Sequence, residues 1–366
     1  MKRYIDAGSA IKETYIQHPI WAETLELCYA NVAMAEPSEV VTVIGPSRVG
    51  KSKLSLAVRG LLNPPGVALD DKESLSIGVR ASNCSKGGAF STKAFAQKTV
   101  TAFNHPIMSD WVAKSLYDDS RGPSEASMWN ALERGLPVAG KRYMFVDEAQ
   151  NITRTTGKNG PGKVLDAWKC FAEEAGIVLI LTGTYALHDA INQAPHVIGR
   201  EGEIHFPRYQ VTKEELKSFL QILKTYEKHL PIDKSMGSLD DHIQFLYFGS
   251  MGCIGHLSRW FRKALARCMV MKSDITLEIL RLSRVSDSKL RLLSDDIRSG
   301  EEVMAISNLF CSPHYEDLEM PDPVQNKENQ EINDQPSTKK QRDQKPYTCN
   351  AERRKAGDRV KGVVDV

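Results

Sequence analysis

Residues 45–52, GPSRVGKS, have the composition and spacing of a phosphate-binding loop. The apolar run Val40–Ile44 before them is expected to be a strand, and Lys51–Leu62 is expected to be a helix. In such a loop, glycines let backbone N–H groups point at phosphates, while Lys51 adds a positive charge and Ser52 offers a hydroxyl to Mg²⁺. A glycine-rich turn without a ligand is the alternative, and the placement between a strand and a helix disfavours it.

The loop therefore predicts a site for ATP and Mg²⁺. The expected nucleotide contacts are the loop and the start of the helix: Gly45, Pro46, Ser47, Arg48, Val49, Gly50, Lys51, Ser52 and Lys53.

A second motif, RYMFVDEAQ, supplies acidic groups. The strand expected over 143–146 ends at Asp147, which can hold Mg²⁺ through water, and Glu148 can polarise the attacking water. The separation from the loop leaves room for one intervening strand. Acidic residues also favour helix N-termini, which is the alternative explanation. Together the motifs predict that Lys51 and Glu148 are catalytic, and that Ser52 and Asp147 hold the metal.

The apolar segment IVLILTGT ends in Thr182 and Thr184. A polar side chain at the carboxyl end of a strand, beside a phosphate crevice, can sense the γ-phosphate or orient water. Alternatively, one or both threonines cap a helix that begins near Tyr185. We expect Thr184 to be the sensor, with a catalytic role.

Two arginines in HVIGREGEIHFPRY are candidates for an arginine finger. Arg200 precedes the last expected strand and can reach the γ-phosphate of a neighbouring subunit, which makes it the first choice. Arg208 is the second. The alternatives are an ordinary surface role for Arg200 and a structural role for Arg208.

The segment GSMGCIGHLSRWFRKAL opens a helix in which Arg259 or His256 can contact nucleotide. The alternative is an apolar stripe through Leu257 and Trp260 that packs inward and leaves the basic residues solvated. Other basic side chains can face phosphates in a central channel, although a solvated face is their default: Lys86, Lys93, Lys98, Arg154, Lys158 and Lys163.

Strands and helices are expected to alternate through the first half of the chain. The expected strands are Val40–Ile44, 75–80, 143–146, 177–181 and 203–206. The expected helices are 10–35, Lys51–Leu62, Thr92–Phe103, 123–133 and 162–175. This alternation indicates an α/β fold with a mostly parallel sheet and helices on both faces.

From Thr212, a helix-capping residue, the pattern becomes entirely helical. Helices are expected over 212–223, 239–248, 254–269 and 275–282. After Cys311 the chain has almost no apolar residues and is expected to be disordered. The predicted organisation is an N-terminal helical segment 1–38, an α/β core 39–210, a helical domain 211–310 and a basic tail 311–366.

The composition is that of a globular protein of 366 residues, with 41% hydrophobic and 26% charged residues. A net charge of +2 restricts nucleic-acid binding to local basic patches. The seven cysteines form no CxxC pair, which fits a reducing compartment. The N-terminus has no apolar signal segment, and no apolar run is long enough to cross a bilayer. We therefore expect a cytoplasmic protein without a membrane partner.

These motifs together resemble the TnsC/TniB family of AAA+ transposition-regulator ATPases over roughly residues 10–285. The matching segments are TYIQHPIW, GPSRVGKS, FVDEAQ, LTGT, REGEIHFPRY and GCIGHLSRW. The first and last are the most discriminating, because the others occur in many P-loop ATPases. The resemblance implies an AAA+ core with a helical lid. It also implies that TYIQHPIW packs over the adenine, with Ile16, His18 and Pro19 as base contacts. A hydrophobic staple into the first helix is the alternative for TYIQHPIW.

The resemblance further implies a bacterial cytoplasmic protein that forms ATP-dependent homo-oligomers, as rings or helical filaments, on duplex DNA. Such an oligomer recruits transposase subunits to a target marked by a selection protein of the TniQ or TnsD type, and hydrolysis disassembles it. The implied contacts to the DNA backbone are Thr92, Lys93 and Ser124, with Lys98 and Arg154 as further candidates. The C-terminal ERRKAGDRVKGV resembles the basic tail that engages transposase.

Two other functions fit a P-loop ATPase. A signalling or chaperone-like AAA+ ATPase would act on protein partners without DNA. A replication-initiator-type loader would carry a winged-helix domain after the lid, and the polar composition after residue 311 argues against it.

Overall fold

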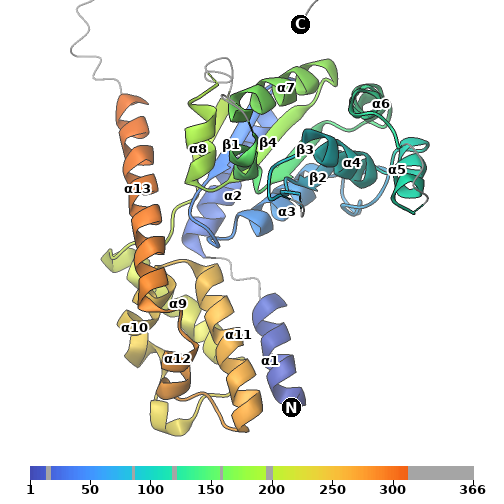
Figure 1. Ribbon diagram of the computed structural model, residues 1–366. Coiled ribbons are helices and arrows are strands. Elements are labelled where there is room, and N and C mark those ends of the chain that lie inside the picture. Colours follow the sequence, from blue (N-terminus) through green and yellow to red (C-terminus); the bar gives the residue numbers. More distant parts are fainter. Residues whose placement is uncertain (14–17, 85–86, 118–121, 157–159, 195–200, 312–366) are drawn as a thin grey trace, which may run out of the picture. The chain divides into compact units, whose positions relative to one another are not determined.

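The computed structural model describes residues 1–13, 18–84, 87–117, 122–156, 160–194 and 201–311. All of them belong to one compact unit, Met1–Pro313. A five-stranded sheet has the order β2-β3-β4-β1-β5, and every adjacent pair is parallel (Figure 1). The strands are β1 Val40–Ile44, β2 Ser76–Arg80, β3 Tyr143–Asp147, β4 Val178–Gly183 and β5 Glu201–His205.

Helices cover both faces of the sheet, as the sequence predicted. α2 (Pro19–Met34) and α3 (Lys51–Leu62) pack on one face. The opposite face carries α4 (Thr92–Phe103), α6 (Glu125–Val138), α7 (Gly160–Glu174) and α8 (Tyr185–Ile191), while α5 (Met108–Tyr117) packs on α4. Because side chains alternate along a strand, the buried strand β1 supplies apolar side chains to both layers.

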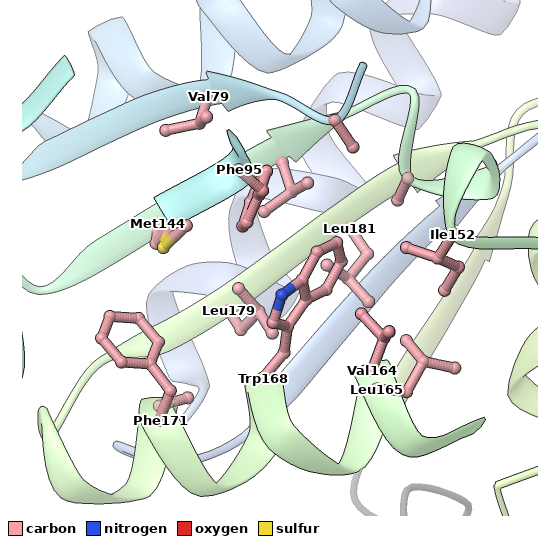
Figure 2. Packing of buried hydrophobic residues seen from close by; sticks show 14 of the residues in the cluster. Val79, Phe95, Met144, Ile152, Val164, Leu165, Trp168, Phe171, Leu179 and Leu181 are labelled. Atoms are coloured by element: carbon pink, nitrogen blue, oxygen red, sulfur yellow. The ribbon is translucent and has the colours of Figure 1, made fainter. Parts of the chain in front are cut away.

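The larger apolar layer centres on aromatic side chains between α7 and the sheet. Figure 2 shows Trp168 of α7 lying beside Leu179 and Leu181 of β4, and Phe95 of α4 belongs to the same apolar cluster. The Trp168 and Phe95 ring centroids are 4.7 Å apart. This packing fixes β4 in the middle of the sheet, where its carboxyl end lies beside the ends of β1 and β3.

A smaller helical lid follows the core. It contains α9 (Lys213–Glu227), α10 (Ile243–Ser250), α11 (Ile254–Met271) and α12 (Leu277–Ser283), together with short 3₁₀ turns at Lys234–Met236 and Leu239–His242. Thr212 is the N-cap of α9, because its side chain accepts a hydrogen bond from the Glu215 N–H, as predicted. The lid has its own apolar core around Phe219, Leu257 and Phe261.

The expectation of one entry helix over 10–35 is wrong, because the described residues form two helices there. α1 (Lys2–Glu13) ends before residues 14–17, which lie outside the described residues, and α2 begins at Pro19. A proline in the first turn is favourable, whereas inside a helix it removes a hydrogen bond and clashes. The two helices also belong to different cores: Ile11 packs in the lid cluster and Val32 in the sheet cluster. The expected segment 1–38 is therefore not one structural unit.

A long helix after the lid, α13 (Asp287–Cys311), was not predicted as a separate element. It returns to the core, where Met304 joins the apolar cluster of the sheet. Glu301 forms a bidentate ion pair with Arg208, with Nε–Oε1 and Nη2–Oε2 distances of 2.9 and 3.0 Å. Arg208 Nη1 also donates to the Tyr247 hydroxyl at 3.1 Å. These contacts agree with the structural alternative for Arg208 and occupy its guanidinium.

No helix among the described residues is long and apolar enough to cross a membrane. The predicted tail from 312 onward lies outside the described residues.

Candidate nucleotide-binding site

Two glycines set the path of the loop between β1 and α3. A Cβ added at Gly45 would lie 2.2 Å from the Phe206 carbonyl oxygen, so only glycine fits beside the residue that follows β5. Gly50 has a φ of 133°, which side-chain-bearing residues rarely adopt. The loop therefore turns directly into α3, whose N-terminal N–H groups attract phosphate.

Lys51 lies at the start of α3. Its Nζ donates hydrogen bonds of 2.8 Å to the carbonyl oxygens of both Gly45 and Pro46. Burial lowers the pKa of this ammonium to about 8, and the nearby carboxylates of Glu148 and Asp147 oppose the shift. Lys51 is thus a largely desolvated cation, for which a phosphate is a strong partner.

The lowered pKa of Lys51 predicts that nucleotide binding depends on pH. A bound phosphate favours the charged ammonium and raises its pKa above the value of about 8 in the free protein. Binding should then take up a proton above that pH, so affinity weakens as the pH rises through about 8. Calorimetry in buffers of different ionisation enthalpy measures this uptake directly. Constant affinity from about pH 7 to about pH 9.5, with no proton uptake, would contradict the prediction.

The predicted metal ligands lie together at the carboxyl edge of the sheet. Ser52 Oγ donates to Asp147 Oδ2 at 2.8 Å, and Asp147 Oδ1 accepts from Thr182 Oγ1 at 3.1 Å. Hydroxyl and carboxylate oxygens suit Mg²⁺, which is usually held by one or two carboxylates together with substrate phosphates. The described residues contain no group of three or more His, Cys, Asp or Glu that would hold a metal unaided. The Ser52–Asp147 pair therefore fits a magnesium ion that arrives with nucleotide.

Glu148 follows β3 in an unusual conformation, with φ 57° and ψ 37°. Its Oε2 accepts a 2.6 Å hydrogen bond from Gln150 Nε2, and its Oε1 lies 3.4 Å from Arg80 Nη2 at the end of β2. The Arg80 side chain is 68% exposed, so this ion pair is weak and easily displaced. A left-handed backbone at a non-glycine residue is typical of functional sites.

Gln150 connects Glu148 to the end of β4, a contact that sequence reasoning missed. Its Oε1 accepts from the Thr184 N–H at 3.3 Å. A Cβ at Gly183 would lie 2.9 Å from that same oxygen, so the glycine in LTGT makes room for the amide. Thr184 is the N-cap of α8, but its side chain makes no capping hydrogen bond. Its sensor role stays a prediction.

These groups line one cavity of about 520 Å³, a volume typical of a ligand site. The core contributes residues 47–53, Asp147, Glu148, Gln150 and Thr184. Lys12 of α1 also lines the cavity, together with lid residues that include Tyr226, Gly255, Ser258 and Arg262.

His18, one of the three predicted base contacts, also lines this cavity. It is the N-cap of α2: its Nδ1 accepts from the Trp21 N–H at 3.2 Å, and its ring lies 5.3 Å from that of Tyr209. Burial lowers the pKa of His18 to about 4, so the ring is neutral at pH 7. Pro19 is exposed at the start of α2, and Ile16 lies outside the described residues.

The lid residues divide between two cavities. Gly255, Ser258 and Arg262 share one face of α11 and line the nucleotide cavity. Arg259, the predicted lid contact, lines a separate cavity together with His256. The structure thus brings Arg262, rather than Arg259, to the predicted nucleotide site.

The lid meets the phosphate-binding loop through Gly255. Its N–H donates to the Arg48 carbonyl oxygen at 2.9 Å, and an added Cβ would lie 2.4 Å from that oxygen. We expect Gly255→Ala to push the lid away from the loop and to lower nucleotide affinity by roughly tenfold or more, the loss of about one hydrogen bond. Gly60→Ala is the matched control, because nothing lies within 4 Å of that Cβ. Equal affinities for both variants in nucleotide titrations would refute this role.

The predicted DNA contacts lie around α4 and α6. Thr92 and Lys93 begin α4, and the Phe90 N–H donates to the Arg154 carbonyl oxygen at 3.2 Å, which brings Arg154 beside the start of that helix. The side chains of Lys93, Lys98 and Arg154 are exposed.

Ser124 caps α6 by accepting from the Ser127 N–H at 3.1 Å. The finger candidate Arg200 and the basic residues Lys86 and Lys158 lie outside the described residues.

Residues 35–191 match the family model described as AAA domain. This region has the AAA+ P-loop fold. It contains β1 to β4, the phosphate-binding loop and the acidic pair, so the predicted AAA+ P-loop fold is confirmed. Among curated proteins, no sequence matches the chain.

Solved structures with this AAA+ fold include the ORC2 protein of Aeropyrum pernix in its ADP form, with a TM-score of 0.52 and 17% identity over 75% of this chain and 71% of that one. Cdc6p of Pyrobaculum aerophilum has a TM-score of 0.49 and 14% identity over 75% of this chain and 69% of that one. Drosophila ORC bound to DNA has a TM-score of 0.49 and 11% identity over 77% and 65%. At 17% identity, the likeness to the Aeropyrum pernix ORC2 protein extends to the fold alone.

Proposed function

We propose that this chain hydrolyses ATP in the cavity between the phosphate-binding loop and the lid. The observation that carries the proposal is the convergence of Lys51, Ser52, Asp147 and Glu148 on one cavity, with Ser52 Oγ 2.8 Å from Asp147 Oδ2. A desolvated cation, a hydroxyl–carboxylate pair and a second carboxylate are the parts that phosphoryl transfer to water needs.

Each group has a distinct task in this mechanism. Lys51 and the N-terminus of α3 bind the β- and γ-phosphates, and Ser52 and Asp147 hold Mg²⁺, which supplies positive charge to the phosphate oxygens. Glu148 orients a water molecule and accepts its proton. Gln150 keeps the Glu148 carboxylate facing the cavity through its 2.6 Å hydrogen bond.

Three further groups complete the proposed site. Arg262 supplies a cation from the lid, and Thr184 senses the γ-phosphate. Arg200 of a neighbouring subunit reaches the γ-phosphate as a finger, which makes assembly and turnover interdependent.

We further propose that ATP binding assembles the chain on duplex DNA and that the assembly regulates transposition by recruiting a transposase and a target-selection protein. The resemblance of TYIQHPIW and GCIGHLSRW to the TnsC/TniB family supports this proposal. Two exposed cations add support: Lys93 in the first turn of α4, and Arg154, whose carbonyl oxygen accepts from the Phe90 N–H just before that helix. Backbone phosphates attract such cations.

Electron microscopy with ATP, with and without duplex DNA, tests the DNA proposal. Rings or filaments should require DNA, and Lys93→Ala with Arg154→Ala should weaken DNA affinity and reduce the slope of its salt dependence by about 2. The matched control, Lys217→Ala with Lys228→Ala, removes the same charge from exposed positions on α9 and its C-cap in the lid. Equal assembly without DNA would favour the signalling or chaperone alternative. Recruitment requires that a transposase subunit associate with the ATP-bound assembly and not with the ADP form.

A further inference from the structure

A second cavity, of about 460 Å³, shares Arg48 and Ser47 with the lining of the nucleotide cavity. The Arg48 backbone belongs to the phosphate-binding loop, with a φ of 63°. The rest of the second cavity is built from the lid and from the start of α13. No step proposed for ATP hydrolysis uses this cavity, although Arg48 and Arg259 in its lining were predicted to contact nucleotide.

Four cationic side chains line the second cavity: Arg48, Arg259, Lys263 and Lys289. No acidic residue lines it, and within the described part of the chain none of the four forms an ion pair. Burial, followed by repulsion from Arg259 and Arg262, lowers the pKa of Arg48. The charge of Glu148, which lines the nucleotide cavity, opposes this shift. The lining of the second cavity itself offers no counter-charge, which a bound anion would supply.

Two residues that line the second cavity each have a buried side-chain atom without a hydrogen-bond partner in the described structure. These atoms are Ser283 Oγ, on a residue that is 4% exposed, and His256 Nε2. Buried polar atoms almost always have partners, so each such exception calls for an explanation. Burial, with repulsion from Arg48 and Arg259, lowers the pKa of His256 to about 4, which leaves a neutral ring that can still donate one N–H.

The polar side chains of this cavity can thus all donate hydrogen bonds, and none is a carboxylate. The remaining wall is largely apolar, with Trp260 and Leu292 among its residues. Leu292 is 71% exposed, which is unfavourable for a large apolar side chain without a partner. A ligand that suits both the cationic part and the apolar part of this lining carries an anionic group and an apolar body.

We propose that the second cavity binds a small organic phosphate, with its phosphate held by Arg48, Arg259 and Lys289 and its body against Leu292 and Leu293. Arginine and lysine with hydroxyl donors are the usual phosphate-binding set. The backbone of duplex DNA offers the same phosphate chemistry, but it has no exposed apolar body to cover Leu292.

Occupancy of this site would act on the nucleotide cavity through Arg48. Its carbonyl oxygen accepts the Gly255 N–H that joins lid and loop, while its side chain lines the second cavity. A ligand that holds Arg48 therefore stabilises the lid against the loop and raises nucleotide affinity. By linkage, nucleotide must raise affinity for the ligand by the same factor.

Calorimetric titration of the full chain with phenyl phosphate tests the site. The nucleotide cavity is first saturated with a non-hydrolysable ATP analogue and Mg²⁺, so that heat reports only additional binding. We expect one saturable site whose affinity falls about tenfold or more in Lys289→Ala and in Arg259→Ala, the loss of one charge-assisted hydrogen bond. Arg267→Ala is the matched control, because this exposed cation on the same helix lines a different cavity.

The proposal would be overturned if the titration showed no saturable binding of phenyl phosphate. It would also be overturned if Arg267→Ala lowered the affinity for phenyl phosphate as much as Lys289→Ala does. The assignment to a small ligand would be overturned if a short DNA duplex displaced phenyl phosphate and Lys289→Ala also bound DNA more weakly. These two results together would show that the site binds a phosphate of the DNA backbone. Because the analogue occupies the nucleotide cavity throughout, its own binding is measured separately. Failure of the second site therefore leaves the proposed ATPase function intact.

Discussion

Replacing Lys51 with alanine is expected to abolish nucleotide binding and, with it, ATP-dependent assembly on DNA. The ammonium is buried, and the loss of its hydration lowers its pKa. A phosphate that meets such a cation gains hydrogen bonds worth about 1.5–3 kcal/mol each, so losing two of them lowers affinity by roughly 10²–10⁴-fold. No other lysine of the loop region replaces it, because Lys53 is exposed and reaches the Lys12 carbonyl oxygen instead.

The folded structure should survive this substitution. Lys51→Ala removes two hydrogen bonds to the Gly45 and Pro46 carbonyl oxygens, but it also removes the unfavourable burial of a charge. Thermal unfolding without nucleotide should therefore change little, while the stabilisation by added nucleotide should disappear. Lys228→Ala, an exposed lysine at the C-cap of α9, should keep that stabilisation. Normal ATP-dependent DNA filaments from Lys51→Ala would refute the mechanism.

The sequence was most informative where one local pattern determined the outcome. β1, α3 and α4 have the predicted bounds, because buried strand runs and amphipathic helices are local periodicities. Thr212 likewise caps α9, because its hydroxyl can accept a hydrogen bond from a backbone N–H in the first turn of the helix. The phosphate-binding loop and the acidic pair meet because parallel strands place their carboxyl ends at one edge of the sheet.

Sheet order was not predictable from spacing along the chain. β2 intervenes between loop and acidic pair in the sequence, yet it lies at the edge of the sheet, and β4 separates β1 from β3. That non-local pairing makes Thr182 a partner of Asp147 and brings the Thr184 N–H to Gln150. A motif of two acids gives no sign of either contact.

In the helical lid, neighbouring residues of one helix line two different cavities. In α11, residues 255, 258 and 262 form one stripe, and residues 256, 259, 260 and 263 form the next. The sequence offered Arg259 or His256 as the nucleotide contact from this helix, whereas the structure places Arg262 in the lining of the nucleotide cavity. The break between α1 and α2 was missed for a related reason. Both segments have helix-forming sequences, but their buried residues belong to different cores.

Glu148→Gln should preserve nucleotide binding and assembly but slow hydrolysis by about 10²–10⁴-fold, the usual contribution of a general base. The amide keeps the size of the side chain and can still accept from Gln150 Nε2 with its oxygen. It cannot take a proton from water. Its nitrogen would face Arg80, an exposed side chain that can turn away at little cost.

The substitution therefore removes the proton acceptor while the rest of the cavity keeps its contacts. Single-turnover hydrolysis and nucleotide affinity, measured on the same sample, separate these effects. If hydrolysis disassembles the oligomer on DNA, Glu148→Gln assemblies formed with ATP should persist as long as wild-type assemblies formed with a non-hydrolysable analogue. Arg80→Ala is the informative companion, because it removes the other partner of Glu148 but leaves the base and the 2.6 Å bond from Gln150. Wild-type turnover by Glu148→Gln would exclude Glu148 as the base, whereas loss of nucleotide binding would show that the carboxylate holds the metal as well.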